Sequence, residues 1–205
     1  MTSSAGVPRF LAEGDAALAR STELVLARTI VAGFTSDDPA AVDHRDRTLA
    51  FVDAHPDALH RSCVEGHLTG SALVVDARTE RILLLFHAKI RRWLQPGGHA
   101  DGDANLPAVA LKEATEETGI SGLRVHPTPI DIDIHRVRAR DETDHDHHDI
   151  RFLVVAPDDA EVVTNHESEG ARWVTLADLA DLADLEPDAG TLRMAHSGLA
   201  LLRAL

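Results

Sequence analysis

Three glutamates lie close together in one short segment, the stretch QPGGHADGDANLPAVALKEATEETGI at residues 95–120. They are Glu113, Glu116 and Glu117. On a helix, residues three and four apart share one face, so these carboxylates would lie side by side and repel one another unless a cation lies among them. Carboxylate oxygens are the ligands that Mg²⁺ and Mn²⁺ prefer. The spacing therefore predicts a divalent-cation site, with a solvated acidic helix face as the alternative.

The residues around the glutamates predict a glycine-rich turn followed by a helix. Gly97 and Gly98 supply the turn, and Asn105 can cap the helix that follows. Pro107 is tolerated in the first turn, and Gly119 suits the left-handed residue that ends a helix. The face opposite the glutamates carries Leu111, Ala114 and Thr118. We therefore expect a helix with one face packed on a sheet and one face of carboxylates.

The rest of the chain predicts strands mixed with a few helices. Apolar spacing predicts two N-terminal helices, from Phe10 to about Phe34 and from Pro39 to about Val52. The β-type runs are residues 67–76, 81–90, 123–139 and 149–157, residues 171–182 are expected to form a strand followed by a short helix, and a terminal helix is expected at 191–205. Without strict alternation of strands and helices, the pattern favours α+β or an α/β/α sandwich. We expect a helical N-terminal extension (1–62), a central domain (63–185) and a C-terminal helix that packs on it (186–205).

Composition excludes several classes of protein. The formal charge of −14 over 205 residues argues against general nucleic-acid binding, which needs clustered Lys and Arg. No stretch reaches the ~20 apolar residues of a membrane span, and the N-terminus lacks the pattern of a secretion signal. Cys63 is the only cysteine, so an internal disulfide is excluded. A reducing compartment fits this composition, and we expect a cytoplasmic protein.

Taken with its flanking residues, the glutamate segment resembles the signature of the Nudix hydrolase family. Gly98 occupies the position of the first glycine of that signature, and KEATEETGI (112–120) matches its end. The resemblance covers about residues 66–185 and implies an α/β/α sandwich around a mixed sheet. It also implies Mg²⁺ or Mn²⁺ as cofactor and, as substrate, a nucleoside diphosphate linked to another moiety, of the nucleotide sugar, ADP-ribose or CDP-alcohol type. Extensions outside the domain often build a dimer interface or shape the pocket in this family, so a homodimer is one expected arrangement.

The resemblance also implies roles for individual residues. Glu113, Glu116 and Glu117 would hold the metal, with the Gly97 carbonyl as a further ligand. Glu113, or an acid outside the motif, would position or deprotonate the attacking water. Glu167, in NHESEGARWV, matches the outside acid, with Glu169 as the second choice and an exposed acidic loop as the alternative. The expected catalytic residues are thus Glu113, Glu116 and Glu167.

Two positions depart from the family pattern. Ala104 stands where the family has its first glutamate, and Lys112 where it usually has arginine. Lysine keeps the charge but loses the bidentate fork of a guanidinium. Asp101 or Asp103 could partly replace the missing carboxylate, although neither is in register. These departures support a second hypothesis, a nucleotide-binding or regulatory module with weakened catalysis.

Histidines cluster in DHDHHDIRF (144–152). If the following strand starts early, His145, His147 and Asp149 share one face. They could then bind a transition metal or contact a substrate phosphate, and a polar loop is the third reading. A zinc hydrolase that uses residues 145–149 is the corresponding functional hypothesis.

Other polar side chains are candidates for binding the substrate. They are Lys89, Arg91, His99, His147 and Arg151, with Arg92 beside them. The basic residues at 89–92 could reach diphosphate oxygens or form a solvated strand end. His99 follows Gly98 and could either face the site or pack the turn.

Overall fold

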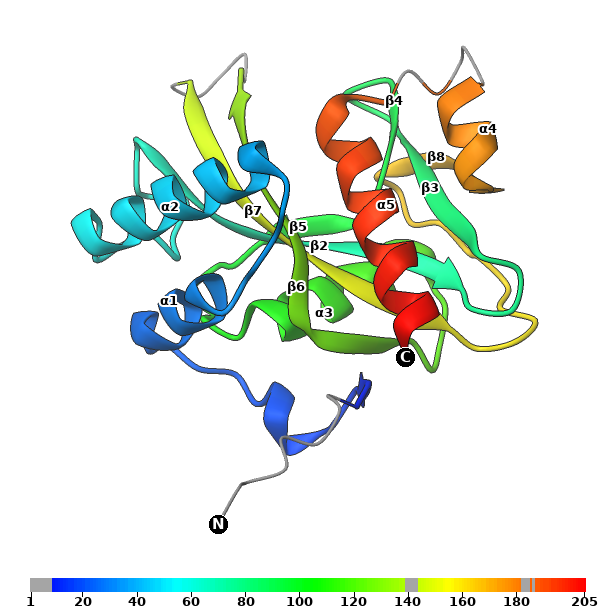
Figure 1. The fold of residues 1–205 in the computed structure, drawn as a ribbon, viewed down its shortest axis with the longest axis horizontal. Helices are drawn as coiled ribbons and strands as arrows, with labels where there is room; N and C mark the ends of the chain where they lie inside the picture. The colour runs from blue at the N-terminus through cyan, green and yellow to red at the C-terminus, as the bar shows by residue number, and fades with distance from the viewer. Residues whose placement is uncertain (1–8, 139–143, 182–184, 186) are drawn as a thin grey trace.

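A computed structural model gives the fold and describes residues 9–138, 144–181, 185 and 187–205 (Figure 1). Within these residues eight strands form one mixed sheet, in the order β1-β6-β7-β2-β3-β4. Its centre is the parallel pair of β2 (Gly66–Asp76) and β7 (His145–Ala156). β6 (Arg124–Val137) runs antiparallel to β7, and β1 (Leu11–Ala12) is added to β6.

The other edge of β2 changes partner along its length. The first half of β2 pairs with β5 (Gly97–His99), and its end pairs with β3 (Arg81–His87). β3 in turn pairs with β4 (Arg92–Leu94) over its last three residues and with β8 (Ser168–Val174) along most of its length, from Ile82 to His87. The sheet therefore divides on this side of β2, between β5 and the β3-β4-β8 group.

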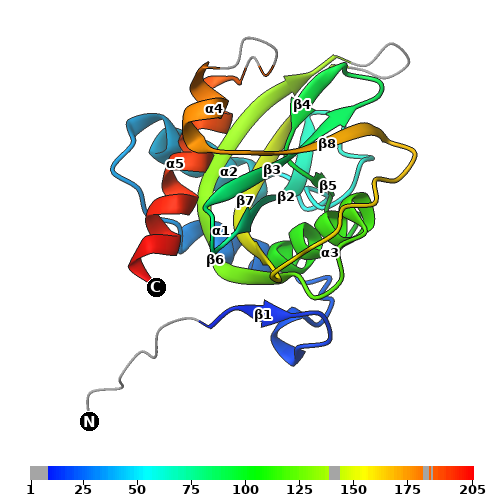
Figure 2. The same cartoon turned by 90° about the vertical axis from the view of Figure 1, so that its right-hand side faces the viewer.

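Helices cover both faces of the sheet (Figures 1 and 2). Alternate residues of β2 and β7 belong to two separate apolar clusters, as the pleat of a strand requires. One cluster contains residues of α1 (Leu24–Ala32), α2 (Pro39–Ala54) and α3 (Leu106–Thr118). The other contains residues of α4 (Leu176–Asp181) and α5 (Ala189–Ala204). The predicted α/β/α sandwich with an N-terminal helical extension is confirmed.

The first predicted helix is wrong over its N-terminal half. Leu11–Ala12 pair with β6, Ala16–Leu18 form one 3-10 turn, and α1 begins only at Leu24. Gly14 adopts a left-handed conformation (φ +84°), and the Asp15 carboxylate accepts a hydrogen bond from the Ala17 N–H. Both features break a continuous helix, and the helical spacing of the apolar residues does not reveal them.

The expected strand at residues 81–90 also ends early, at His87. The His87 ring accepts hydrogen bonds from the backbone N–H groups of Lys89 and Ile90, which closes a turn. The other elements lie within a few residues of their expected positions. Among the described residues, no helix is long and apolar enough to span a membrane.

Candidate active site

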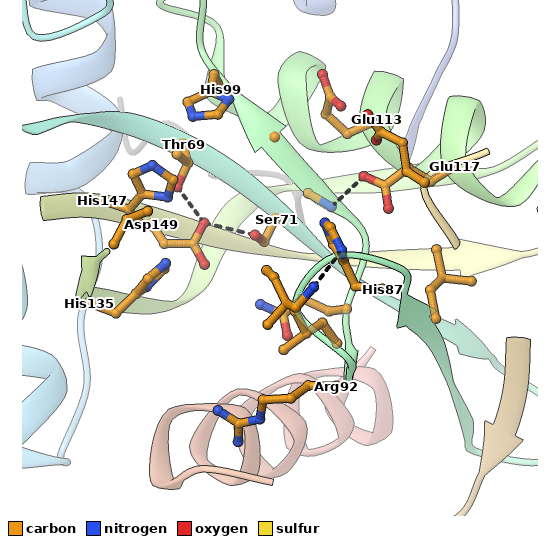
Figure 3. Close-up of a pocket in the computed structure, with 18 of the residues that line it drawn as sticks. Thr69, Ser71, His87, Arg92, His99, Glu113, Glu117, His135, His147 and Asp149 are labelled. Carbon is orange, nitrogen blue, oxygen red and sulfur yellow. Dashed lines mark hydrogen bonds between the residues drawn. The ribbon is translucent and has the colours of Figure 1, made fainter. Parts of the chain in front are cut away.

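A pocket of about 710 Å³ opens where the sheet divides (Figure 3). It is lined from β2, β5, α3, β6 and β7, and from the segment that precedes β8. Figure 3 shows Glu113 and Glu117 on one side, with His135, His147 and Asp149 on the other. The volume lies in the range typical of small-molecule sites, roughly 300–1,000 Å³.

The helix α3 presents its three glutamates to different extents. Glu117 is buried, Glu113 keeps 17% of its side-chain surface exposed, and both line the pocket. The Glu116 carboxylate is 57% exposed and lies 3.6 Å from the Lys112 Nζ, outside the pocket lining. Lys112 also donates to Glu113 over 3.0 Å. The lysine thus bridges two of the three carboxylates, which offsets part of their repulsion.

Gly97 and Gly98, expected to form a turn, instead belong to strand β5, which lies directly against these carboxylates. A Cβ at Gly98 would meet the Glu113 carboxylate at 2.5 Å, so only glycine allows this approach without a shift. The Gly97 N–H donates to Glu117 Oε1 over 3.2 Å. Burial raises the pKa of Glu117 to about 7, and the charges of Glu113, Glu167 and Glu116 act in the same direction, against the Gly97 hydrogen bond. Glu117 is therefore the carboxyl whose ionisation depends most on a nearby cation.

Glu167 reaches the same pocket from a different element. It lies just before β8 and lines the pocket together with Glu113 and Glu117. Its backbone is fixed on both sides, because its N–H donates to Asn165 Oδ1 and its carbonyl accepts from the Ala88 N–H. Glu169, the second choice, forms an ion pair with Arg91 and does not line the pocket.

Ala104 is fully buried under the N-terminal extension. Its N–H donates to the Ser21 carbonyl over 2.6 Å. Asn105 occupies the cap position of α3, but its side-chain amide donates to the Ala17 and Ala19 carbonyls instead of capping the helix. The extension thus occupies the place where the family signature has a glutamate.

The two aspartates considered as replacements for that glutamate are also engaged. Asp103 accepts from the N–H groups of Ser21 and Asn105, and Asp101 pairs with Arg61 at 2.7 Å. Neither lines the pocket. The structure therefore supplies no substitute for the missing carboxylate from these two residues.

A buried network of charges forms the floor of the pocket. Asp149 accepts from the Thr69 and Ser71 hydroxyls and from the Arg151 Nε, each over 2.8 Å. The Arg151 guanidinium also pairs with Asp131 and Asp133, which pair with Arg193 of α5. Arg151 is 3% exposed. Although it lines the pocket, its guanidinium is held by three carboxylates, so it orients Asp149 rather than presenting a free fork to a substrate.

The predicted basic residues are divided between two places. Lys89 and Arg92 line the pocket, whereas Arg91 does not and instead covers the Phe86 ring at 4.7 Å. Arg136 and Arg138, which the sequence analysis did not select, also line the pocket. Arg136 lies on β6 and Arg138 directly follows that strand, and nothing in the sequence of this run indicates a pocket.

β7 begins at His145, which is the early strand start needed to place His145, His147 and Asp149 on one face. His145 and His147 bring their Nε2 atoms within 3.2 Å of each other, whereas Asp149 is occupied by Thr69, Ser71 and Arg151. His99 and His147 line the pocket. The additional partners of His147 are His67 and His135, which come from neighbouring strands and are far apart in the sequence.

A model of the NUDIX domain matches residues 67–194. A C. elegans Ap4A hydrolase, in a binary complex, is 20% identical, with 67% of this chain and 98% of that chain covered and a TM-score of 0.54. A protein from Jonesia denitrificans described as a possible asymmetric Ap4A hydrolase is 12% identical (66% and 94% covered, TM-score 0.53). A NUDIX-family hydrolase from Clostridium perfringens is 22% identical (66% and 97% covered, TM-score 0.51). No curated protein matched.

Fold and comparisons together define a hydrolase built on an α/β/α sandwich. Because the NUDIX model matches well over half of the sequence, the chain belongs to the NUDIX family and is an enzyme of the pyrophosphohydrolase class. At their level of identity, the three solved structures support the fold alone. The family resemblance inferred from residues 98–120 is confirmed.

Proposed function

We propose that the protein is a Mg²⁺- or Mn²⁺-dependent pyrophosphohydrolase. Its substrate would be a nucleoside diphosphate linked to another moiety, of the nucleotide sugar, ADP-ribose or CDP-alcohol type. The observation that carries this proposal is the gathering of Glu113, Glu117 and Glu167 in one pocket beside Gly97 and Gly98. Basic residues at another part of the same pocket, among them Lys89 and Arg92, suit the phosphates of such a substrate.

The residues present fit a hard divalent cation. All the side-chain donors are carboxylate oxygens, which Mg²⁺ and Mn²⁺ prefer. Burial and neighbouring carboxylates raise the pKa of Glu117 to about 7, which a cation would reverse. When bound, such a cation neutralises charge on the phosphate oxygens and activates a water molecule.

The chain's own residues have distinct roles in this proposal. Glu113, Glu116 and Glu117 hold the cation, with the Gly97 carbonyl beside them. Glu116 supplies the ligand nearest to solvent, since its carboxylate is the most exposed of the three. Glu167 accepts the proton of the attacking water, because it faces the pocket from outside α3. Lys89 and Arg92 bind the phosphate oxygens, and Asp149 with Thr69 and Ser71 keeps the pocket floor rigid.

A substrate panel tests the proposal. The purified protein is incubated with Mg²⁺ or Mn²⁺ and with ADP-ribose, nucleotide sugars, CDP-alcohols, dinucleoside polyphosphates, coenzyme A and nucleoside triphosphates. We expect metal-dependent release of phosphate-containing products from at least one nucleoside diphosphate derivative, and loss of most of that activity in Glu116→Gln. A folded, metal-loaded protein that turns over none of these compounds would contradict the proposal.

Ala104, which stands where the family has a glutamate, motivates the alternative of a nucleotide-binding or regulatory module with weakened catalysis. The same assay tests this alternative. A binding or regulatory module would show ligand-dependent thermal stabilisation without turnover.

We also propose a cytoplasmic location, with which the single buried thiol of Cys63 is compatible, and a homodimer, for which sedimentation in solution is the test.

A further inference from the structure

Histidines from three strands meet at one wall of the pocket. His67 lies on β2, His99 on β5 and His147 on β7. His67 and His147 are direct neighbours in the parallel β2-β7 pair. The ring centroids of the three histidines are 4.8–4.9 Å apart in every pairing. The sheet therefore brings together three imidazoles from residues that are up to eighty positions apart in the sequence.

His67 has no adequate partner within the described protein. It is 3% exposed, and neither of its ring nitrogens makes a hydrogen bond of acceptable geometry. The Cys63 backbone only partly offsets the lowering of the His67 pKa by burial. Leaving a buried polar group unpaired costs about 1–3 kcal/mol, so an imidazole in this position calls for a partner that is absent from the polypeptide.

The distances suit one metal ion. One nitrogen from each of the three rings lies within 4.8 Å of the others. A tetrahedral Zn²⁺ with Zn–N bonds of about 2.0–2.1 Å places its ligand nitrogens roughly 3.3 Å apart. His145 Nε2 lies 3.2 Å from His147 Nε2, which already matches that spacing. Ring rotations and small shifts within the cluster would bring His67 and His99 to the same separation.

The protonation states also suit metal binding, since only a neutral imidazole is a ligand. Burial lowers the pKa of His147 to about 2 and of His99 to about 4, and neighbouring histidines and, for His99, Arg61 act in the same direction. Burial and the charge of His145 likewise lower the pKa of His67. Burial thus favours the neutral form of all three imidazoles, in addition to the geometry that brings them together.

We propose that His67, His99 and His147 bind one divalent transition-metal ion of the Zn²⁺ class, with His145 as the nearest candidate for a fourth ligand. The ion ties β5 to β2 and β7, and it forms part of the pocket wall because His99 and His147 face the cavity. The ion takes the place of the direct contact between the Nε2 atoms of His145 and His147. This set differs from the one expected along β7 alone: His67 and His99 take the place of Asp149, which is held by Thr69 and Ser71.

The proposed site is separate from the carboxylate site, although the two are neighbours. Gly98 lies against Glu113, and the next residue, His99, lies against His67. Nitrogen ligands favour Zn²⁺ and related ions, whereas the carboxylates favour Mg²⁺. The two sites therefore select different metals, and the proposal does not depend on which substrate the enzyme hydrolyses.

Cobalt titration of the full chain tests the inference. The protein is stripped with a chelator, supplied with excess Mg²⁺ to fill the carboxylate site, and titrated with Co²⁺. Tetrahedral Co²⁺ with nitrogen ligands absorbs strongly in the visible range, whereas octahedral Co²⁺ with oxygen ligands absorbs weakly. We expect one strongly absorbing ion per chain, which Zn²⁺ displaces, and a rise in the melting temperature on addition of Zn²⁺.

Variants locate the ion. His67→Gln, His99→Gln and His147→Gln are each expected to weaken binding by at least roughly tenfold and to abolish the thermal stabilisation by Zn²⁺. His196→Gln, at an exposed position on α5, and Glu117→Gln are expected to leave the cobalt spectrum unchanged. If His67→Gln fails to fold, His99→Gln still tests whether the histidines bind the ion. His99 is only partly buried and its side chain faces the pocket, so this substitution should leave the fold intact.

Two results would overturn the inference. One is a chelator-stripped protein that takes up no Co²⁺ or Zn²⁺ while circular dichroism shows that it is folded. The other is stoichiometric binding that persists in the histidine variants and disappears in Glu117→Gln, which would assign the ion to the carboxylates.

Discussion

Gly98 shows how a single missing side chain determines the geometry of the acidic site. Its Cα lies so close to α3 that a methyl group would meet the Glu113 carboxylate at 2.5 Å. The contact is with the far end of a flexible side chain, so the carboxylate can move away while the fold stays intact. Gly98 therefore allows the Glu113 carboxylate to keep its position, and it contributes little to the stability of the fold.

Gly98→Ala is expected to reduce kcat by roughly 100-fold with little change in melting temperature, because displacing a catalytic group by about 1 Å has effects of this size. Steady-state kinetics on whichever substrate the panel identifies, together with thermal unfolding, would measure both quantities. Gly170→Ala is the matched control, since its added methyl would meet only Trp93 at 3.7 Å and Phe86 at 4.0 Å, both ordinary van der Waals contacts. Equal rates in the two variants would show that catalysis does not require the Glu113 carboxylate to stay at this position.

Glu117 links the acidic site to the stability of the metal-free protein. Burial, with the neighbouring carboxylates, raises its pKa to about 7, from an ordinary value near 4.5. Between these two pH values the folded state binds more protons than the unfolded state, so stability falls as pH rises through this window. In chelator, wild-type protein is expected to lose on the order of 3 kcal/mol relative to Glu117→Gln between pH 4.5 and pH 7.5.

Urea unfolding of both proteins at a series of pH values measures this difference. Added Mg²⁺ should reverse it, because a bound cation favours the ionised carboxylate. Glu161→Gln, which alters an exposed glutamate, is the control and should follow the wild-type curve. Parallel curves for wild type and Glu117→Gln would show that the buried carboxyl does not carry this linkage.

At the scale of elements, sequence patterns located α3 and its boundaries well. Gly119 ends the helix with φ +65°, as predicted from its glycine, and the glutamates lie on the expected face. The cap was wrong in its mechanism, because the Asn105 amide binds the carbonyls of Ala17 and Ala19. A capping preference is local, whereas this contact joins segments more than eighty residues apart, so no local pattern could reveal it.

The same limit applies to the pocket. The motif at 98–120 predicted the acidic side, because its residues are close together in sequence and its glutamates all lie on α3. The opposite wall combines His67, His99 and His147 from three strands, and their meeting depends on the β2-β5 and β2-β7 registers. Strand register is a tertiary property, so the sequence offered His99 and His147 as separate candidates but could not show that they meet each other and His67.

A substitution at Ala104 tests how the N-terminal extension packs on the residues before α3. The residue is fully buried, and its N–H binds the Ser21 carbonyl. Ala104→Glu is expected to destabilise the protein by about 2 kcal/mol or more without raising the rate of hydrolysis, because a buried carboxylate would displace the extension. Thermal unfolding and initial rates measure the two effects, and Ala50→Glu, at an exposed position of α2, is the control. A faster and equally stable Ala104→Glu enzyme would show instead that the family glutamate can be restored here.

Across the whole molecule, the C-terminal helix is tied to the pocket floor by charge as well as by apolar packing. Arg193 of α5 pairs with Asp131 at 2.7 Å and with Asp133 at 2.9 Å. These aspartates also hold Arg151, which binds Asp149 beneath the pocket. A continuous path of ion pairs thus joins the second helical layer, the centre of the sheet and the site.

Removing one end of this path should be costly, because the remaining carboxylates are buried. Arg193→Met is expected to destabilise the protein by about 3–5 kcal/mol, the range for breaking a buried ion pair from one side. Arg203→Met, on the same helix, removes an exposed pair with Glu80 and should cost far less, because solvent screens an exposed ion pair. Urea unfolding measures both values. Because the path ends at Asp149, the folded fraction of Arg193→Met should also hydrolyse substrate more slowly, whereas a mere loss of helix packing would leave that rate unchanged. Equal destabilisation by the two substitutions, with unchanged rates, would mean that apolar packing alone holds α5 and that the charge network does not reach the site.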